Sequence, residues 1–372
     1  MKRTDTNPDA INPDAINPDA INPPTQDPIA MPLHRPAHPP TPNQRSLTMS
    51  ATDTLTYPPS KSSRRPKAGG ATWALALGLV AAACAPEMDP ASRIERTRVI
   101  GARVEVAGDP GRASPRPGQA ATVTWLVTAP AEMPPLGWAF LVCPARSASL
   151  YCDGDPLAVF QGTQGPPMIE LQVPEATALG EATELRLFGR ICISSQPTFD
   201  GPSGRPTCTD AGDGTTAALS IPLAQGGEGN HNPSLAQTSI SLDGQPWPSS
   251  ESETCDDLPK IAADTLEHRI AFGTTAADRE RYTGLTGDPA TPVERREWLQ
   301  ISQFTTAGEL ERQFSTVEAE APDDQGQVEV KWDAPKADEV SETGLLAHFT
   351  FVARDPRGGS DWLTRALCVT RP

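Results

Sequence analysis

Residues 100–106 read IGARVEV, and this stretch decides the fold class. Apolar and polar side chains alternate along it, the apolar ones being Ile100, Ala102, Val104 and Val106. Successive side chains of a β-strand point to opposite faces of a sheet. The alternation therefore predicts a half-buried strand, with one face toward a core and the other toward solvent.

Comparable segments recur along the chain on both sides of a Gly/Asn-rich stretch at 225–233. Before it they lie at 122–127, 138–142, 169–173, 185–193 and 217–223, and after it at 239–242, 266–272, 298–304, 328–332, 346–353 and 362–369. Short strands separated by Pro, Gly and Asp clusters are typical of β-sandwiches. We therefore expect one sandwich at 94–224, a linker at 225–233 and a second sandwich at 234–372. Asp243-Gly244 predicts a hairpin turn, and 276–282 and 308–314 predict helical turns.

The composition agrees with this class and excludes others. The chain has 372 residues, with 41 Pro, 29 Gly and a formal net charge of −16. So much Pro and Gly disfavours an all-helical protein. After residue 84 there are 23 basic and 41 acidic side chains. A nucleic-acid partner is not expected, because phosphate binding needs a basic face.

The first 48 residues do not have the composition of a folded domain. Residues 7–23 repeat NPDAI, and Pro recurs too often there for a helix or a sheet. We expect 1–48 to be disordered. We also expect it to be an upstream extension of the reading frame, with Met49 as the start, because a signal peptide begins within about 30 residues of its cleavage site.

Residues 49–83 have the organisation of a signal peptide. A basic patch containing Lys61 and Arg64 precedes the apolar run ATWALALGLVAAA at 71–83, which is too short to span a membrane. The order Val80-Ala81-Ala82-Ala83-Cys84 resembles the lipobox of bacterial lipoproteins, although Ala81 stands where Leu is usual. The alternatives are an ordinary signal peptide followed by an incidental cysteine, and a twin-arginine signal at 63–65.

The lipoprotein resemblance implies that Cys84 is acylated and is the membrane anchor of the mature chain. Residues 84–93 would then be a tether. In such lipoproteins an Asp after the cysteine favours retention in the inner membrane, and this chain has Ala85. The resemblance therefore implies a lipid-anchored protein of the outer membrane, on its periplasmic face or at the cell surface.

The last segments carry a second resemblance. Phe349 and Phe351 lead to Asp355-Pro356-Arg357-Gly358-Gly359, and Trp362 follows. This order resembles the closing hairpin of immunoglobulin-like modules of the PKD or cadherin-like type, and the whole pattern is similar to lipoproteins of myxobacteria. Together they imply an all-β protein with two immunoglobulin-like sandwiches after a disordered N-terminal region and a signal peptide.

The mature region lacks the signs of a catalytic or metal site. Its histidines are His231, His268 and His348, and none lies in a catalytic motif. Asp153-Gly154-Asp155 and residues 210–214 resemble calcium loops but lack the spaced ligands of an EF-hand. Carboxylate pairs such as Glu294 and Glu297 are uninformative in so acidic a chain. We expect no enzyme, no cofactor and no metal.

Two functions stay open for such a chain. The first is an envelope-anchored binding or structural module with an envelope protein or polysaccharide as partner. The alternative is a carbohydrate-binding or enzyme-accessory domain that presents exposed rings, for which the candidates are Trp247, Trp298, Trp332 and Tyr282. Burial of these rings would argue for a role in the core instead.

The remaining six cysteines are expected to form disulfides, because their number is even and the compartment outside the cytosol is oxidising. Spacing favours Cys143–Cys152 and Cys192–Cys208 in the first sandwich, with Cys143–Cys192 as the rival pairing. In the second sandwich Cys255 and Cys368 are then expected to pair. No C-x-x-C pair indicates a metal site.

Overall fold

The computed structural model describes residues 90–146, 155–201, 204–210, 212–224, 229–235, 239–249, 254–286, 291–322 and 326–372. Strands dominate these residues and the helices are three or four residues long, which confirms the all-β prediction. No helix in this part of the chain is long and apolar enough to cross a membrane. The NPDAI repeat, the signal peptide, Cys84, Cys152 and the Asp153-Gly154 half of one calcium-like loop lie outside the described residues.

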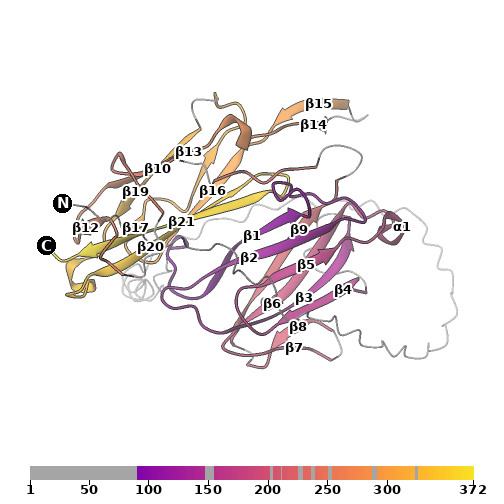
Figure 1. Cartoon of the computed structure of the whole chain (residues 1–372), viewed down its shortest axis with the longest axis horizontal. Coiled ribbons are helices and arrows are strands. Elements are labelled where there is room, and N and C mark those ends of the chain that lie inside the picture. The colour runs from indigo at the N-terminus through magenta and orange to yellow at the C-terminus, as the bar shows by residue number, and fades with distance from the viewer. Residues whose placement is uncertain are drawn as a thin grey trace, which may run out of the picture. The chain divides into compact units, whose positions relative to one another are not determined.

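The first sandwich pairs a three-stranded with a four-stranded antiparallel sheet (Figure 1). One sheet has the order β1-β2-β5, with bounds β1 (Arg98–Val106), β2 (Ala120–Thr128) and β5 (Met168–Gln172). The other has the order β4-β3-β6-β9, with bounds β4 (Ala158–Gly162), β3 (Leu136–Ala145), β6 (Glu184–Ile193) and β9 (Gly214–Pro222). Because β5 returns to pair with β2 while β6 pairs with β3, the strand order is that of an immunoglobulin-like sandwich.

The core of this sandwich follows from the period-two patterns. Along β2, Ala121, Val123, Trp125 and Val127 are buried and the residues between them are not. The Trp125 ring stacks on Phe140 of β3 with ring centroids 4.9 Å apart. Only 3% of Trp125 is exposed, so it is a core residue, as the alternation at 122–127 predicts.

Strand β3 departs from one-sided burial, because residues 136–143 are all buried. A hairpin of β7 (Pro197–Phe199) and β8 (Pro206–Cys208) covers its outer face. A Cβ at Gly137 would lie 2.7 Å from the Ser195 carbonyl oxygen and 2.8 Å from Pro197 Cδ. Cover on both faces explains why this strand reads as a continuous apolar run. A short helix, α1 (Ala176–Leu179), connects β5 to β6.

The second sandwich contains two five-stranded sheets. One has the order β11-β10-β13-β19-β17, with bounds β11 (Gln245–Pro246), β10 (Ile240–Leu242), β13 (His268–Gly273), β19 (Gln327–Asp333) and β17 (Glu309–Leu310). The other has the order β12-β21-β20-β16-β18, with bounds β12 (Lys260–Ala262), β21 (Ser360–Thr370), β20 (Leu345–Arg354), β16 (Leu299–Thr305) and β18 (Phe314–Val317). The chain thus supplies an edge strand to each sheet before β13, and β12 runs parallel to β21.

A separate two-stranded hairpin, β14 (Arg281–Thr286) and β15 (Thr291–Arg296), leaves the second sandwich between β13 and β16 (Figure 1). Its residues are mostly exposed on both faces. At its base, the buried Arg279 guanidinium donates hydrogen bonds to the carbonyl oxygens of Glu318 and Ala321, at 2.9 and 2.8 Å. The hairpin is therefore anchored through its base and not through a core of its own.

Local turn chemistry agrees with the sequence at one predicted turn. Asp243 and Gly244 connect β10 to β11 with φ angles of 52° and 75°. Two consecutive positive φ angles define the hairpin turn for which Asp-Gly is preferred, so the predicted hairpin is confirmed.

The helical turn predicted at 308–314 is wrong. Glu309 and Leu310 form β17 and pair with Asp333 and Trp332 of β19. Leu310 is 5% exposed in the core, so burial against the sheet outweighs the local helical pattern. Between 276 and 282 only η1 (Ala276–Asp278) is helical, as a 3-10 turn, and the other such turn is η2 (Ala337–Glu339).

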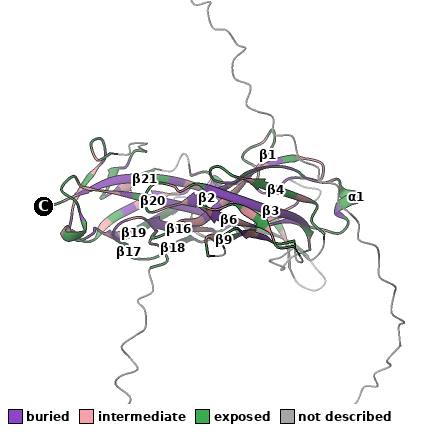
Figure 2. Ribbon diagram, turned by 90° about the horizontal axis from the view of Figure 1, so that it is seen from below, coloured by how far each residue is buried: buried purple, intermediate pink, exposed green. Residues whose placement is uncertain are grey.

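Residues just before β1 pack on the second sandwich. Ile94 joins Ile100, Phe304 and Val352 in a small apolar cluster, and the cluster bridges β1 to strands β16 and β20. Buried residues lie along the strands of both sandwiches (Figure 2). The two sandwiches consequently share a packed contact as well as the chain segment around residue 230.

Candidate functional site

A polar cluster with a buried centre occupies the junction between the sandwiches, and we call it the junction cluster. Three parts of the chain build it: residues 230–232 between the sandwiches, Glu280 and Glu297 at the base of the β14–β15 hairpin, and the turn 355–359 between β20 and β21. Asn230 and Asp355, which contact each other, lie 125 positions apart in sequence. The cluster therefore exists only in the folded chain.

Asp355 organises the turn between β20 and β21. Its carboxylate accepts hydrogen bonds from the backbone N–H groups of Arg357 and Gly359, at 2.7 and 2.9 Å. The side-chain amide of Asn230 donates to the same carboxylate at 3.0 Å. Gly358 has a φ of 97°, and a Cβ on Gly359 would lie 2.6 Å from the His231 carbonyl oxygen. The D-x-x-G-G pattern is thus explained by turn geometry and by contact with the interdomain segment.

Arg357 links this turn to the hairpin base. Its Nη1 donates to Glu280 and Glu297 at 3.2 and 3.1 Å, and its guanidinium lies 4.7 Å from the Tyr282 ring centroid. His231 Nδ1 lies 2.5 Å from Glu280 Oε1. One arginine therefore holds two carboxylates, and a histidine from the interdomain segment contacts one of them.

Burial and like charge shift two acids of the cluster. Burial, together with the nearby Asp355 carboxylate, raises the pKa of Glu297 to about 8, although Arg357 opposes this shift. Burial also raises the pKa of Asp355, against the hydrogen bonds from Asn230 and the turn amides. Carboxylates that share one low-dielectric site cannot all ionise without cost. Glu297 is therefore largely protonated at neutral pH.

This arrangement suits a structural connection better than acid–base chemistry. The Glu297 side chain is only 1% exposed, so a substrate could not reach it in this conformation. The described residues also contain no group of three or more His, Cys, Asp or Glu side chains placed to hold a metal ion. What the cluster does is tie the interdomain segment, the hairpin base and the β20–β21 turn together.

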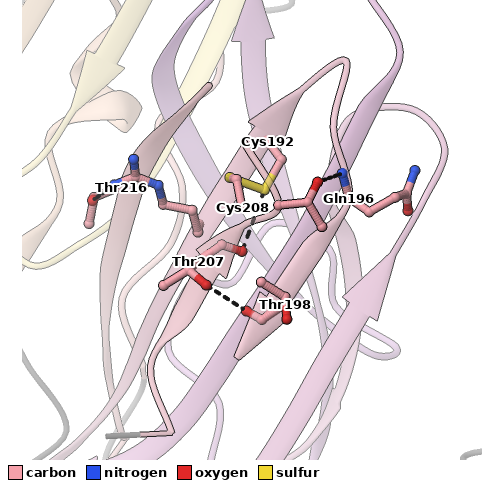
Figure 3. Close-up of a disulfide and its surroundings, with 8 residues drawn as sticks. Cys192, Gln196, Thr198, Thr207, Cys208 and Thr216 are labelled. Atoms are coloured by element: carbon pink, nitrogen blue, oxygen red, sulfur yellow. Dashed lines mark hydrogen bonds between the residues drawn. A yellow bond between two sulfur atoms is a disulfide. The ribbon is translucent and has the colours of Figure 1, made fainter. Parts of the chain in front are cut away.

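Two of the expected cysteine pairs form disulfides. Cys192 of β6 bonds to Cys208 of β8, with Cα atoms 5.6 Å apart, and fastens the covering hairpin to the outer face of the sheet (Figure 3). Thr207 donates its hydroxyl to the Thr198 carbonyl within that hairpin. The rival Cys143–Cys192 pairing is excluded. Cys143 is disulfide-bonded, and its expected partner Cys152 lies outside the described residues.

Cys255 bonds to Cys368, with Cα atoms 5.1 Å apart across 113 positions of sequence. This is the pair expected from the sequence. Cys368 also pairs in register with Lys260, so the disulfide holds the start of β12 beside β21. Gly344 packs on the bond: a Cβ there would lie 2.8 Å from the Cys368 sulfur, and its φ of 94° also favours glycine.

The four aromatic residues considered for sugar binding do not form one surface platform. Trp247 and Trp332 are 2% and 0% exposed and contact Phe349 in the core. Trp298 is 38% exposed, whereas Tyr282 is half-buried under Arg357. The core interpretation therefore holds for the two buried tryptophans.

Sequence reasoning did not select the residues of the junction cluster. In the sequence Glu297 is one of many carboxylates, His231 lies in the expected linker at 225–233, and Asp355 begins the expected turn of the closing hairpin. The only local signal was the D-x-x-G-G turn, which marks Asp355 but not its partners. The described residues of that linker are ordered, and Asn230 is only 1% exposed.

No protein-family model and no curated protein matches the chain. Solved structures similar to it include a red sea bream transglutaminase, at 10% identity over 75% of this chain and 32% of that one, with a TM-score of 0.21. Fibronectin(III)-like modules of Clostridium thermocellum CbhA match at 7% identity over 72% and 93%, with a TM-score of 0.17. Trypsin-activated alpha-2-macroglobulin from Escherichia coli matches at 11% identity over 74% and 17%, with a TM-score of 0.18.

The chain thus spans a third or less of the transglutaminase and macroglobulin chains. TM-scores this low carry no argument about this protein. Its fold class rests on the strand order described above.

Proposed function

We propose that this chain is an envelope-anchored lipoprotein whose two sandwiches act as a non-catalytic binding or structural module. The observation that carries the proposal is the junction cluster. Its most perturbed acid, Glu297, is sealed from solvent and bonded between structural elements. A general acid must instead reach the proton that it transfers.

The disulfides support the extracytoplasmic part of the proposal. Each sandwich contains a disulfide between described cysteines, Cys192–Cys208 in the first and Cys255–Cys368 in the second. Such bonds persist in oxidising compartments and are rare in the cytosol. Acylation of Cys84 would then hold the module at the outer membrane, where an envelope protein or polysaccharide is the expected partner.

Metabolic labelling with a clickable fatty acid tests the anchor. The wild-type protein should carry the label and sediment with the outer membrane, whereas Cys84→Ser should be unlabelled and should accumulate as unprocessed or soluble protein. Cys143→Ser serves as a matched control, because it removes a cysteine that the anchor does not use. Unlabelled wild-type protein in the soluble fraction would refute the proposal.

A further inference from the structure

We propose that residues 93–98 form a membrane-facing surface that contacts the phosphate headgroups of the membrane in which Cys84 is anchored. The proposal rests on the proposed lipid anchor. It goes beyond that anchor by naming the face of the protein that meets the lipid and the chemistry of the contact.

The first observation is that the chain is fixed to the protein body a few residues after the anchor. Ile94 donates its backbone N–H to the Thr305 carbonyl at 2.8 Å, and Thr305 donates to the Ser92 carbonyl at 2.9 Å. The Arg93 guanidinium donates to the Gly308 carbonyl at 2.6 Å. Ser92 and Ile94 are 4% and 2% exposed. The fixed part of the chain therefore begins before Arg93.

The second observation is the length of chain left between this docked segment and the acyl group. Pro90, the first described residue, follows Cys84 by six positions. Fully extended, six residues span at most about 20 Å. Pro90 cannot lie farther than this from the acylated cysteine, and Arg93 donates its backbone N–H to the Pro90 carbonyl at 2.8 Å. An exposed side chain at residues 93–98 is therefore among those nearest to the headgroups.

The third observation is a reversal of local charge. After Cys84 the chain has 23 basic and 41 acidic residues, yet residues 93–98 hold Arg93, Arg96 and Arg98 against Glu95 alone. Arg93 and Arg98 donate to backbone carbonyl oxygens, which leave the guanidinium charge in place. Arg98 also lies over the Phe304 ring, 5.8 Å from its centroid. Arg96 is exposed.

These observations favour a lipid surface over a protein partner. An acidic protein near an anionic membrane is repelled unless its nearest face carries positive charge. Arginine also binds phosphate through paired N–H donors. Because the short chain from Cys84 keeps residues 93–98 near the membrane, we infer that the membrane, and not a protein, is what contacts this surface.

The test uses the acylated full-length protein in detergent micelles and in vesicles of phosphatidylethanolamine with phosphatidylglycerol. Phenylglyoxal modifies exposed arginines, and peptide mass spectrometry reports the rate for each one. Arg96 should react at least three-fold more slowly in the vesicles than in micelles. Arg146, which is 72% exposed at another site, should react equally in both. Adding 0.5 M salt should restore the Arg96 rate, because it screens exposed charges.

Three outcomes would overturn the inference: equal Arg96 reactivity in vesicles and micelles, equal slowing of Arg96 and Arg146, or protection of Arg96 in native envelopes but not in vesicles. The last result would identify a protein as the occupant. Failure of the anchor is seen separately, as absence of fatty acid label on the wild-type protein. Labelled protein with an unprotected Arg96 would contradict this inference alone.

Discussion

The two sandwiches both bury tryptophans in their cores, but they differ in whether the indole N–H groups are hydrogen-bonded. In the first, the indole N–H groups of Trp125 and Trp138 are buried and have no hydrogen-bond acceptor among the described residues. In the second, Trp247 donates its indole N–H to the Ala366 carbonyl, and Trp332 donates to the Ala307 carbonyl, both at 3.0 Å. All four tryptophans are buried, with 8% or less of each exposed. Apolar packing alone therefore holds the two tryptophans of the first sandwich, whereas those of the second also donate hydrogen bonds.

Their disulfides differ in a parallel way. The Cys192–Cys208 bond closes 16 residues and fastens a covering hairpin, whereas Cys255–Cys368 closes 113 residues and ties the start of the second sandwich to its last strand. Long loops lose more entropy in the unfolded chain when they are closed. The Cys255–Cys368 bond should therefore stabilise the whole second sandwich, whereas Cys192–Cys208 stabilises only the attachment of one hairpin.

Removing each disulfide separately tests this difference, and it should have the largest effect on the free energy of unfolding. Chain entropy predicts a loss of about 5 kcal/mol for Cys255→Ser with Cys368→Ser, because its loop is long. It predicts about 3 kcal/mol for Cys192→Ser with Cys208→Ser. Urea unfolding followed by circular dichroism measures both losses. Equal losses, or a larger loss for the short loop, would contradict the entropic ranking.

Replacing one tryptophan in each sandwich tests how much the indole hydrogen bond of the second sandwich contributes to stability. Trp125 and Trp247 are 3% and 2% exposed, and each packs on a phenylalanine, so Trp→Phe removes similar ring area from both. Trp247→Phe also leaves the Ala366 carbonyl without its indole donor, whereas Trp125→Phe removes an unpaired donor. We expect Trp247→Phe to lower the free energy of unfolding by about 1–3 kcal/mol more than Trp125→Phe.

Urea unfolding monitored by circular dichroism checks this difference, because it does not depend on the tryptophan that is removed. Trp362→Phe is a suitable control, since its ring is only partly buried beside the small interdomain cluster. A larger loss for Trp125→Phe than for Trp247→Phe would show that ring packing, and not the hydrogen bond, decides the cost.

The junction cluster gives the second sandwich a pH dependence. The folded pKa of Glu297 is about 8, above its ordinary value of 4.5, so the folded state binds this proton more tightly. The resulting stability is fully present below pH 4.5 and is lost as pH rises through 8. One proton gives a slope of at most about 1.4 kcal/mol per pH unit. The raised pKa of Asp355 acts in the same direction.

Glu297→Gln should flatten that slope, because the amide stays neutral and has nearly the same shape. Unfolding free energies measured from pH 5 to 8 would show it. Glu294→Gln is the matched control: Glu294 lies on the same hairpin but is 67% exposed, beside Arg281. An unchanged slope in Glu297→Gln, or the same flattening in Glu294→Gln, would rule out Glu297 as the titrating group.

Much of the fold could be predicted because it depends on local periodicity. The alternation at 100–106 and 122–127 identified β1 and β2, and Asp243-Gly244 identified its turn. The Cys255–Cys368 pair followed from counting cysteines within each predicted domain. The short edge strands β4, β12 and β18 were missed, because three to five residues are too few to show a period.

The junction cluster could not be predicted, because its properties belong to no single segment. The protonation of Glu297 depends on Asp355, Arg357 and Glu280, and the first two come from a turn about sixty residues away. Likewise, the β7–β8 hairpin, which lies about sixty positions later in the chain, returns to cover the outer face of β3. Sequence by itself determined which residues face a core, since side-chain direction alternates along a strand. Only the tertiary structure decided which charged groups are buried next to one another. Coulomb energies depend on distance in space, and desolvation depends on burial, and neither follows from position along the chain.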